Sequence, residues 1–127
     1  MSRRPVSLSE IQLSVMHALW RQGQADIQMV VEAMAADGRE LAYTTVATLL
    51  KRLEKRGLVA HEKSGRKQIF HAQVTESEVR ESMVSGLIGS LFRGDPQALA
   101  SHLVENHDMD ESDLRALRQL IDTSDKS

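Results

Sequence analysis

Residues 43–59 read YTTVATLLKRLEKRGLV, and the spacing of their apolar side chains decides the fold. Apolar residues recur at the intervals that place them on one face of an α-helix: Val46, Leu49, Leu50 and Leu53. The opposite face has threonines in its first turns and lysine and arginine in its last turns, and Gly57 is the residue type that ends helices. Short hydroxylated side chains followed by cations are typical of a helix that reads base edges and contacts phosphates in DNA.

A cationic β-hairpin is predicted directly after this helix. Residues 59–63 and 68–74 read as two strands, because β-branched and aromatic residues flank a turn at residues 64–67. Gly65 can supply the positive φ of a tight turn. A helix of this kind followed by a basic hairpin predicts a helix-turn-helix with a wing. The basic residues that we expect to contact DNA phosphates are Lys51, Arg52, Lys55, Arg56, Lys63, Arg66 and Lys67.

Two more helices are predicted before this region. Ser7 and Glu10 have the spacing of a capping box at the start of the first helix, and Asp26 can cap the second. Three helices and a hairpin make a winged helix, so we expect residues 1–74 to form a winged-helix DNA-binding domain. The predicted fold class is mainly α with a small β-hairpin.

Residues 75–127 are predicted to form a helical dimerisation region. Asp95-Pro96 and Asp110 mark the starts of two of its three amphipathic helices. So small an appendage cannot bury all of its aliphatic surface alone, and a second copy of the chain would cover it. The alternative is that these helices fold back onto the winged domain. The residues expected at the dimer interface are Leu87, Ile88, Leu91, Leu99, Leu103, Leu117 and Ile121.

Charge is segregated along the chain, whose 127 residues carry a net charge of −2. Residues 39–67 contain eight basic and three acidic residues, a net charge of +5. Residues 74–127 contain five basic and eleven acidic residues, a net charge of −6. The basic middle suits nucleic acid, and the acidic part should lie away from phosphates.

Composition excludes several classes of protein. The chain has no cysteine, which excludes disulfides, thiolate metal sites and cysteine catalysis, and which fits a cytoplasmic protein. It has neither a signal peptide nor an apolar run long enough to span a membrane. Its serine, histidine and aspartate residues form no catalytic motif, so we expect neither an enzyme nor a cofactor.

Two alternatives to a simple DNA-binding repressor remain open. The first is a metal-responsive repressor with histidine ligands. His61 and His71 lie on the two predicted strands, and His102 and His107 are five residues apart, but none of the five histidines has the spacing of zinc ligands, so we expect no metal site. The second is a winged-helix module for protein–protein interaction. Such a module would present apolar or acidic residues on its third helix, whereas threonine, lysine and arginine favour DNA.

The segments IQLSVMHALW, at residues 11–20, and YTTVATLLKRLEKRGLV resemble the penicillinase-repressor family of the BlaI, MecI and CopY type. The pattern T-V-x-T-L-L-x-R-L-x-K-x-G is specific, and the likeness covers almost the whole chain. It implies a homodimeric winged-helix transcriptional repressor that binds a palindromic operator. The helix arginine of the family matches Arg52, which we expect on phosphate. The base-reading turn of the family matches Tyr43, Thr44, Thr45, Ala47 and Thr48.

The resemblance also implies how repression is relieved and which genes are controlled. In the best-known members a membrane-bound sensor triggers proteolysis, and the target genes serve β-lactam resistance. Those members are cut at an Asn-Phe bond, and the matching pair here is His102-Leu103, which departs from that pattern. CopY-type members bind copper through cysteines, which this chain lacks. The implied partners are operator DNA, a second copy of the chain and a sensor protease.

Overall fold

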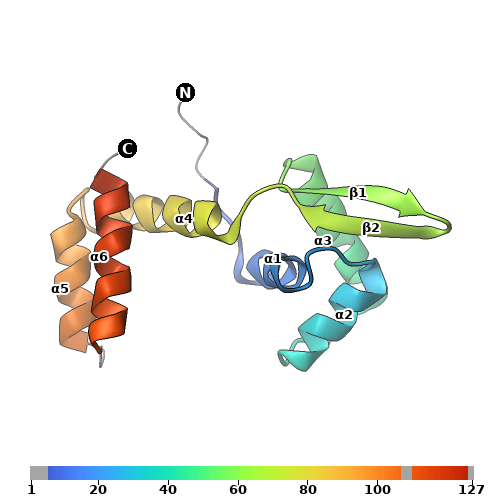
Figure 1. Ribbon diagram of the computed structural model, residues 1–127, viewed down its shortest axis with the longest axis horizontal. Coiled ribbons are helices and arrows are strands. Elements are labelled where there is room, and N and C mark those ends of the chain that lie inside the picture. Colours follow the sequence, from blue (N-terminus) through green and yellow to red (C-terminus); the bar gives the residue numbers. More distant parts are fainter. Residues whose placement is uncertain (1–5, 107–109, 126–127) are drawn as a thin grey trace. The chain divides into compact units, whose positions relative to one another are not determined.

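The computed structural model describes residues 6–106 and 110–125, which divide into two units (Figure 1). The winged unit is Leu8–Glu76. The C-terminal unit is Ser77–Ser127 together with the segment before Leu8, of which Val6 and Ser7 are described. The backbone N–H of Val6 donates to the hydroxyl of Ser82 at 2.6 Å, which explains why the chain start groups with the later helices rather than with the winged unit.

The winged unit contains three helices followed by an antiparallel hairpin, as its sequence predicts. The elements are α1 (Glu10–Gln22), α2 (Ile27–Ala36), α3 (Tyr43–Lys55), β1 (Val59–Ser64) and β2 (Lys67–Ala72). The hairpin packs beside the helices of this unit in Figure 1. The fold class is therefore confirmed: mostly helical, with a two-stranded sheet.

The first helix begins at a different cap from the predicted one. The hydroxyl of Ser9 accepts a hydrogen bond from the backbone N–H of Gln12 at 3.2 Å. The side chain of Gln12 accepts from the backbone N–H of Ser9 at 3.1 Å, which completes a capping box. The Ser7–Glu10 prediction was wrong because two overlapping boxes occur in the sequence, and glutamine serves at the third helical position as well as glutamate. The prediction for α2 is confirmed, since Asp26 accepts from the N–H of Met29 at 2.8 Å.

The apolar stripe of α3 faces the core, and the helix ends where the sequence predicts. Val46, Leu49, Leu50 and Leu53 are each at most 8% exposed. Gly57 has a φ of 79°, a backbone conformation that favours glycine. The N–H of Leu58 donates to the carbonyl of Leu53 at 3.0 Å and the N–H of Gly57 to that of Glu54 at 2.9 Å, the Schellman pattern. This turn leads the chain directly into β1.

The hairpin is joined to the rest of the winged unit through its second strand. Its register pairs Val59 with Ala72 and Ser64 with Lys67, which leaves a two-residue turn at Gly65-Arg66. Gly65 has a φ of 64°, as a type II′ turn requires at this position. Ala25, in the loop between α1 and α2, exchanges backbone hydrogen bonds of 3.0 and 2.8 Å with Phe70. Phe70 is only 2% exposed, so the wing is anchored in the core at its base.

The first helix also holds the segment that leads into the C-terminal helices. The indole N–H of Trp20 donates to the carbonyl of Val74 at 3.0 Å. The imidazole Nδ1 of His17 lies 3.3 Å from a carboxylate oxygen of Glu76. Both contacts lie within the winged unit, which therefore includes the residues up to Glu76.

Two of the three helices assigned to the C-terminal unit begin at an aspartate. The elements are α4 (Glu76–Leu91), α5 (Pro96–Asn106) and α6 (Glu111–Asp125). Asp95 accepts from the N–H of Gln97 at 2.9 Å, and Asp110 accepts from that of Asp113 at 2.8 Å, as predicted for both starts. Helices α5 and α6 lie side by side (Figure 1). Among the described residues, no helix combines the length and apolar character needed to cross a bilayer.

Candidate nucleic-acid interface

The start of α3 presents the predicted base-reading residues at the surface. Tyr43 is 51% exposed. Thr44, Thr45 and Thr48 are exposed, and Ala47 is partly buried. They face outward because the stripe of Val46, Leu49, Leu50 and Leu53 occupies the inward face of the same turns. The sequence pattern therefore located an exposed, hydroxyl-rich helix face correctly.

The hydroxyl group of Thr48 is partly committed within the helix. Its Oγ1 donates to the backbone carbonyl of Thr44 at 2.9 Å. The oxygen can still accept a hydrogen bond, and the methyl group can still contact another apolar group. At a DNA base edge this side chain would therefore act through its methyl group or as an acceptor, rather than as a donor.

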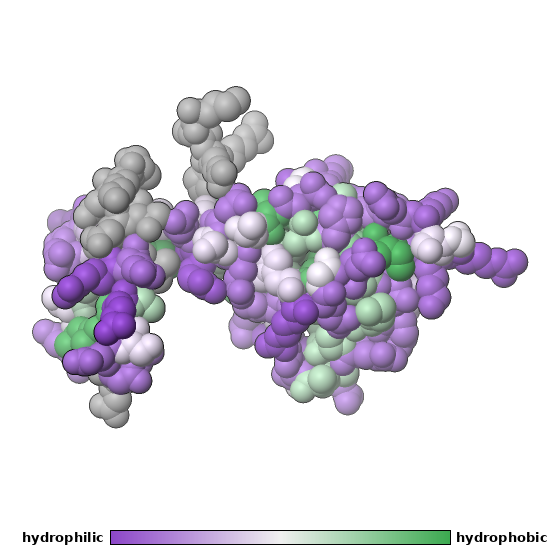
Figure 2. All heavy atoms as spheres, viewed as in Figure 1, coloured by the Kyte–Doolittle hydropathy of each residue, from purple (hydrophilic) through white to green (hydrophobic). Residues whose placement is uncertain are grey.

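The seven predicted phosphate contacts are all exposed and lie on two elements or immediately after them. Four are in the second half of α3 or at its C-terminal cap, and three are on the hairpin. The cations at the end of α3 also interact favourably with the negative end of the helix dipole. In Figure 2 the tip of the hairpin is hydrophilic. These exposed residues are Lys51, Arg52, Lys55, Arg56, Lys63, Arg66 and Lys67.

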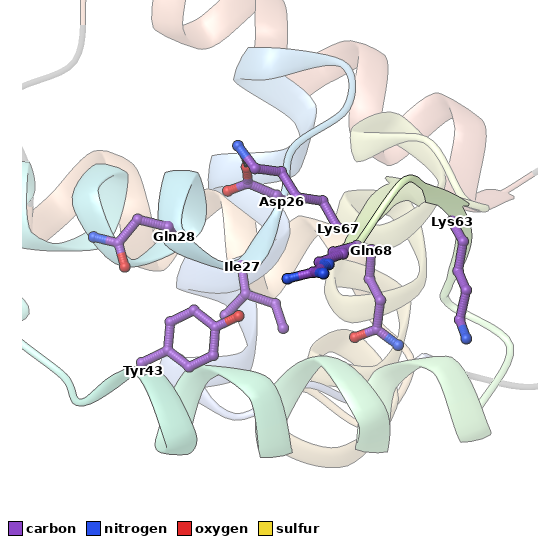
Figure 3. Close-up of a pocket in the computed structure, with 8 residues that line it drawn as sticks. Asp26, Ile27, Gln28, Tyr43, Lys63, Lys67 and Gln68 are labelled. Atoms are coloured by element: carbon purple, nitrogen blue, oxygen red, sulfur yellow. Dashed lines mark ion pairs between the residues drawn. The ribbon is translucent and has the colours of Figure 1, made fainter.

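A cavity of about 540 Å³ lies where the starts of α2 and α3 meet the hairpin (Figure 3). Three of its lining residues are the hairpin cations and one is the acidic Asp26, so the lining of the cavity has a net positive charge. In Figure 3 the side chains of Lys63 and Gln68 extend from the hairpin toward α3. The residues that line the cavity are Asp26, Ile27, Gln28, Tyr43, Lys63, Arg66, Lys67 and Gln68.

Asp26 has a second role in this cavity that the sequence did not reveal. One carboxylate oxygen caps α2, and the other lies 3.5 Å from the ammonium group of Lys67. The Asp26 side chain is 14% exposed and that of Lys67 is 72% exposed. An ion pair with one largely exposed partner adds little stability. Lys67 can therefore exchange this carboxylate for another anion at small cost.

The hairpin register separates the two histidines that were considered as a metal pair. His61 stands opposite Phe70, whereas His71 stands opposite Ala60, so the two imidazoles project from opposite faces of the hairpin. His71 instead contacts the side chain of Gln73 at 2.7 Å. In the part of the chain that the structure describes, no group of three or more potential ligands could hold a metal ion. His107 lies outside the described residues.

The residues predicted for dimerisation and cleavage occupy different environments. Leu87 and Leu91 on α4 are 38% and 69% exposed. Ile88 and Leu99 are each 5% exposed, so they are already buried within the chain. The His102-Leu103 pair lies inside α5, where the side chain of Asn106 donates to the carbonyl of His102 at 2.8 Å, and Leu103 is partly buried. The side chains of Leu117 and Ile121 lie outside the described part of the structure.

Comparison with known proteins agrees with this geometry. The family described as "Penicillinase repressor" matches residues 8–123. The transcriptional regulator BlaI of Mycobacterium tuberculosis (strain H37Rv) is 36% identical over 117 residues, which cover 89% of this chain and 84% of that protein. The methicillin resistance regulatory protein MecI of Staphylococcus aureus (strain N315) is 22% identical over 121 residues, which cover 95% of this chain and 98% of that protein.

A solved structure matches the winged unit. The solution structure of the DNA-binding domain of the repressor BlaI superposes with a TM-score of 0.51 and 27% identity, covering 61% of this chain and 93% of that chain. The members of the penicillinase repressor family are transcriptional repressors rather than enzymes. The chain therefore belongs to the penicillinase repressor family and is a DNA-binding transcriptional repressor of the BlaI and MecI type.

Proposed function

We propose that this repressor binds a palindromic operator as a homodimer, with one winged unit on each half-site. The observation that carries the proposal is the exposed face of α3, with threonines in its first turns and cations in its last. In the major groove the first turns would meet base edges, through Tyr43, Thr44, Thr45, Ala47 and Thr48. The cations of α3 and of the hairpin would contact the phosphates on either side.

The C-terminal unit is proposed to hold the two copies together. It leaves four large apolar side chains exposed among the described residues: Leu87, Leu91, Val104 and Leu114. Figure 2 shows hydrophobic side chains on the visible face of α5 and α6. Burying one leucine stabilises an interface by roughly 1.5–3 kcal/mol. The net charge of −6 over residues 74–127 disfavours DNA on this surface, and a second copy of the chain is the partner that we propose there.

Relief of repression is proposed to act on the same unit. Cleavage between His102 and Leu103 would separate the end of α5 and all of α6 from the winged unit. Because this bond lies within a helix, a protease would act on a locally opened form of α5. A membrane-bound sensor would control the cut. Relatives named for methicillin resistance support genes of β-lactam resistance as targets.

Selection of binding sites from a random DNA pool tests the proposal. The full chain should recover an inverted repeat whose half-sites are about one helical turn apart, on one side of the duplex. A variant with Thr45→Ala and Thr48→Ala should recover a less defined motif. Recovery of a single unrepeated motif by the wild-type chain would contradict the dimeric arrangement, and recovery of no motif would contradict base reading by α3.

A further inference from the structure

We propose that Glu54 and His61 form a brace that positions the wing against α3, and that His61 is thereby a positioning residue for operator recognition. Glu54 is on α3 and His61 is on β1. A carboxylate oxygen of Glu54 lies 2.6 Å from the imidazole Nδ1 of His61. The functional part of this inference rests on the proposed reading of an operator by α3 and the wing.

Both partners of the brace are partly shielded from water, whereas in the ion pair between the wing and Asp26 only the carboxylate is shielded. The side chains of His61 and Glu54 are 26% and 32% exposed, whereas that of Lys67 in the pair with Asp26 is 72% exposed. A short, partly buried hydrogen bond to a carboxylate is stronger than an exposed ion pair. Of these two polar contacts, the one between Glu54 and His61 is therefore the stronger restraint on the wing, in addition to the buried side chain of Phe70 at its base.

The contact continues from α3 across both strands of the hairpin. When the imidazole is neutral, donation from Nδ1 to the carboxylate leaves Nε2 as an acceptor, and the amide nitrogen of Gln68 lies 3.4 Å from it. The His61 ring also packs against Phe70, with 5.1 Å between ring centroids. This chain of contacts connects α3 to both strands of the hairpin, through Glu54, His61 and Gln68. It adds to the buried contact of Phe70 at the base of the wing.

This connection matters because the wing and α3 carry different groups of cations. Gln68, at the far end of the brace, stands opposite Lys63 in the hairpin register, and both line the cationic cavity. If the wing is held at a fixed distance from α3, its cations reach the DNA phosphates while α3 lies in the major groove. Glu54 is also the acidic residue amid the cations of α3, and the contact with His61 turns its carboxylate toward the hairpin.

The test compares His61→Ala with a matched control, His71→Ala. His71 is on the adjacent strand but projects from the other face of the hairpin, away from Glu54. The measured quantity is the ratio of affinities for the operator selected by the wild-type chain and for random DNA of equal length. Loss of the brace should lower this ratio about threefold to tenfold, because a mobile wing must be ordered in the operator complex, where α3 occupies the groove, whereas binding to random DNA requires no single wing position. The control should keep the wild-type ratio.

A conservative variant and a spectroscopic measurement separate positioning from simple stabilisation. His61→Asn places an amide donor near the position of Nδ1 and should restore most of the ratio. In the wild-type chain at alkaline pH, long-range ¹H–¹⁵N spectra should show the His61 proton on Nδ1, and Glu54→Ala should move it to Nε2. Thermal unfolding of each variant establishes that it is folded at the assay temperature.

Four results would overturn the brace: an unchanged ratio in His61→Ala, an equal loss in His71→Ala, a wild-type proton on Nε2, or a ratio in His61→Asn that is no better than that in His61→Ala. A wild-type chain without any sequence preference would instead contradict the proposed function. In that case the position of the His61 proton still decides whether the brace exists.

Discussion

The two units of this repressor treat their apolar side chains differently. In the winged unit the stripes of three helices and the base of the hairpin meet one another, and Val15, Met16, Val30 and Leu50 are fully buried. In the C-terminal unit, Leu91 is 69% exposed. Of the six large apolar residues that are exposed in the described part of the chain, four belong to the C-terminal unit. The winged unit thus buries most of its large apolar side chains in its own core, whereas the C-terminal unit leaves several exposed on its surface.

The same contrast appears in charge. Seven of the eight basic residues between 39 and 67 lie on the part of the winged unit that we assign to DNA, whereas residues 74–127 have a net charge of −6. A surface that is apolar and acidic repels DNA phosphates and so does not compete with the winged unit for DNA. The proposed tasks of reading DNA and pairing two copies are therefore assigned to different units, each with its own sequence signal.

Removing the C-terminal unit should have the largest effect on operator binding. A chain ending after Glu76 retains the contacts of His17 and Trp20, so it should fold. Its affinity for a complete operator should fall by a factor on the order of 10²–10⁴, because the second half-site is no longer bound intramolecularly. Fluorescence anisotropy with full and half operators measures this. Equal affinities of the two chains for the full operator would contradict the proposal that dimerisation through the C-terminal unit strengthens operator binding.

Replacing one exposed leucine in the C-terminal unit should weaken the dimer. Leu91→Ser should raise the dimer dissociation constant by roughly 100-fold or more, because both copies carry the substitution and two leucines, at roughly 1.5 kcal/mol or more each, are no longer buried. Met29→Ser is the matched control, since Met29 is an exposed apolar residue of the winged unit at 39% exposure. If both variants change the dissociation constant equally, then pairing is not confined to the C-terminal unit.

Threonines of the winged unit should change specificity rather than dimerisation. Thr48→Val keeps the methyl group and removes the hydroxyl, whereas Thr48→Ser does the reverse. Because the Thr48 hydroxyl already donates to Thr44, we expect the methyl group to be read. Thr48→Ser should therefore lose about 1–3 kcal/mol of discrimination at one base pair, and Thr48→Val should lose little. Competition binding with single base-pair substitutions checks this, and the opposite ranking would assign readout to the hydroxyl.

The smallest expected effect concerns individual phosphate contacts. Arg52→Ala or Lys55→Ala should weaken binding to all DNA sequences alike and reduce the slope of log K against log salt by about 0.9. Glu105→Ala, in the C-terminal unit, is the control and should leave the slope unchanged. Titrations at several salt concentrations give these slopes. An unchanged slope in both cationic variants would place α3 outside the interface.

Local features of the winged unit could be predicted from sequence because they depend on neighbouring residues. The stripe from Val46 to Leu53, the end of α3 at Gly57 and the cap at Asp26 each rest on spacings of a few residues. The first cap was mispredicted because two overlapping patterns compete, and the structure has the capping box of Ser9 and Gln12.

Contacts between distant residues could not be predicted in this way. The pairing of Ala25 with Phe70 and the contact of Asp26 with Lys67 join positions more than 40 residues apart. Glu54 and His61 are close in sequence, yet their contact depends on the turn at Gly57 and on the hairpin register. The residues that we propose to read bases and contact phosphates were predicted from residue type and helical face, which needs no knowledge of these contacts.

Sedimentation equilibrium of the full chain and of the chain ending after Glu76 tests the division of labour most directly. Both should be measured at micromolar concentration, without DNA and with a half-site duplex. The full chain should have twice its monomer mass and bind two half-site duplexes, and the shorter chain should be a monomer that binds one. Two monomers, or two dimers, would contradict the assignment of pairing to the C-terminal unit.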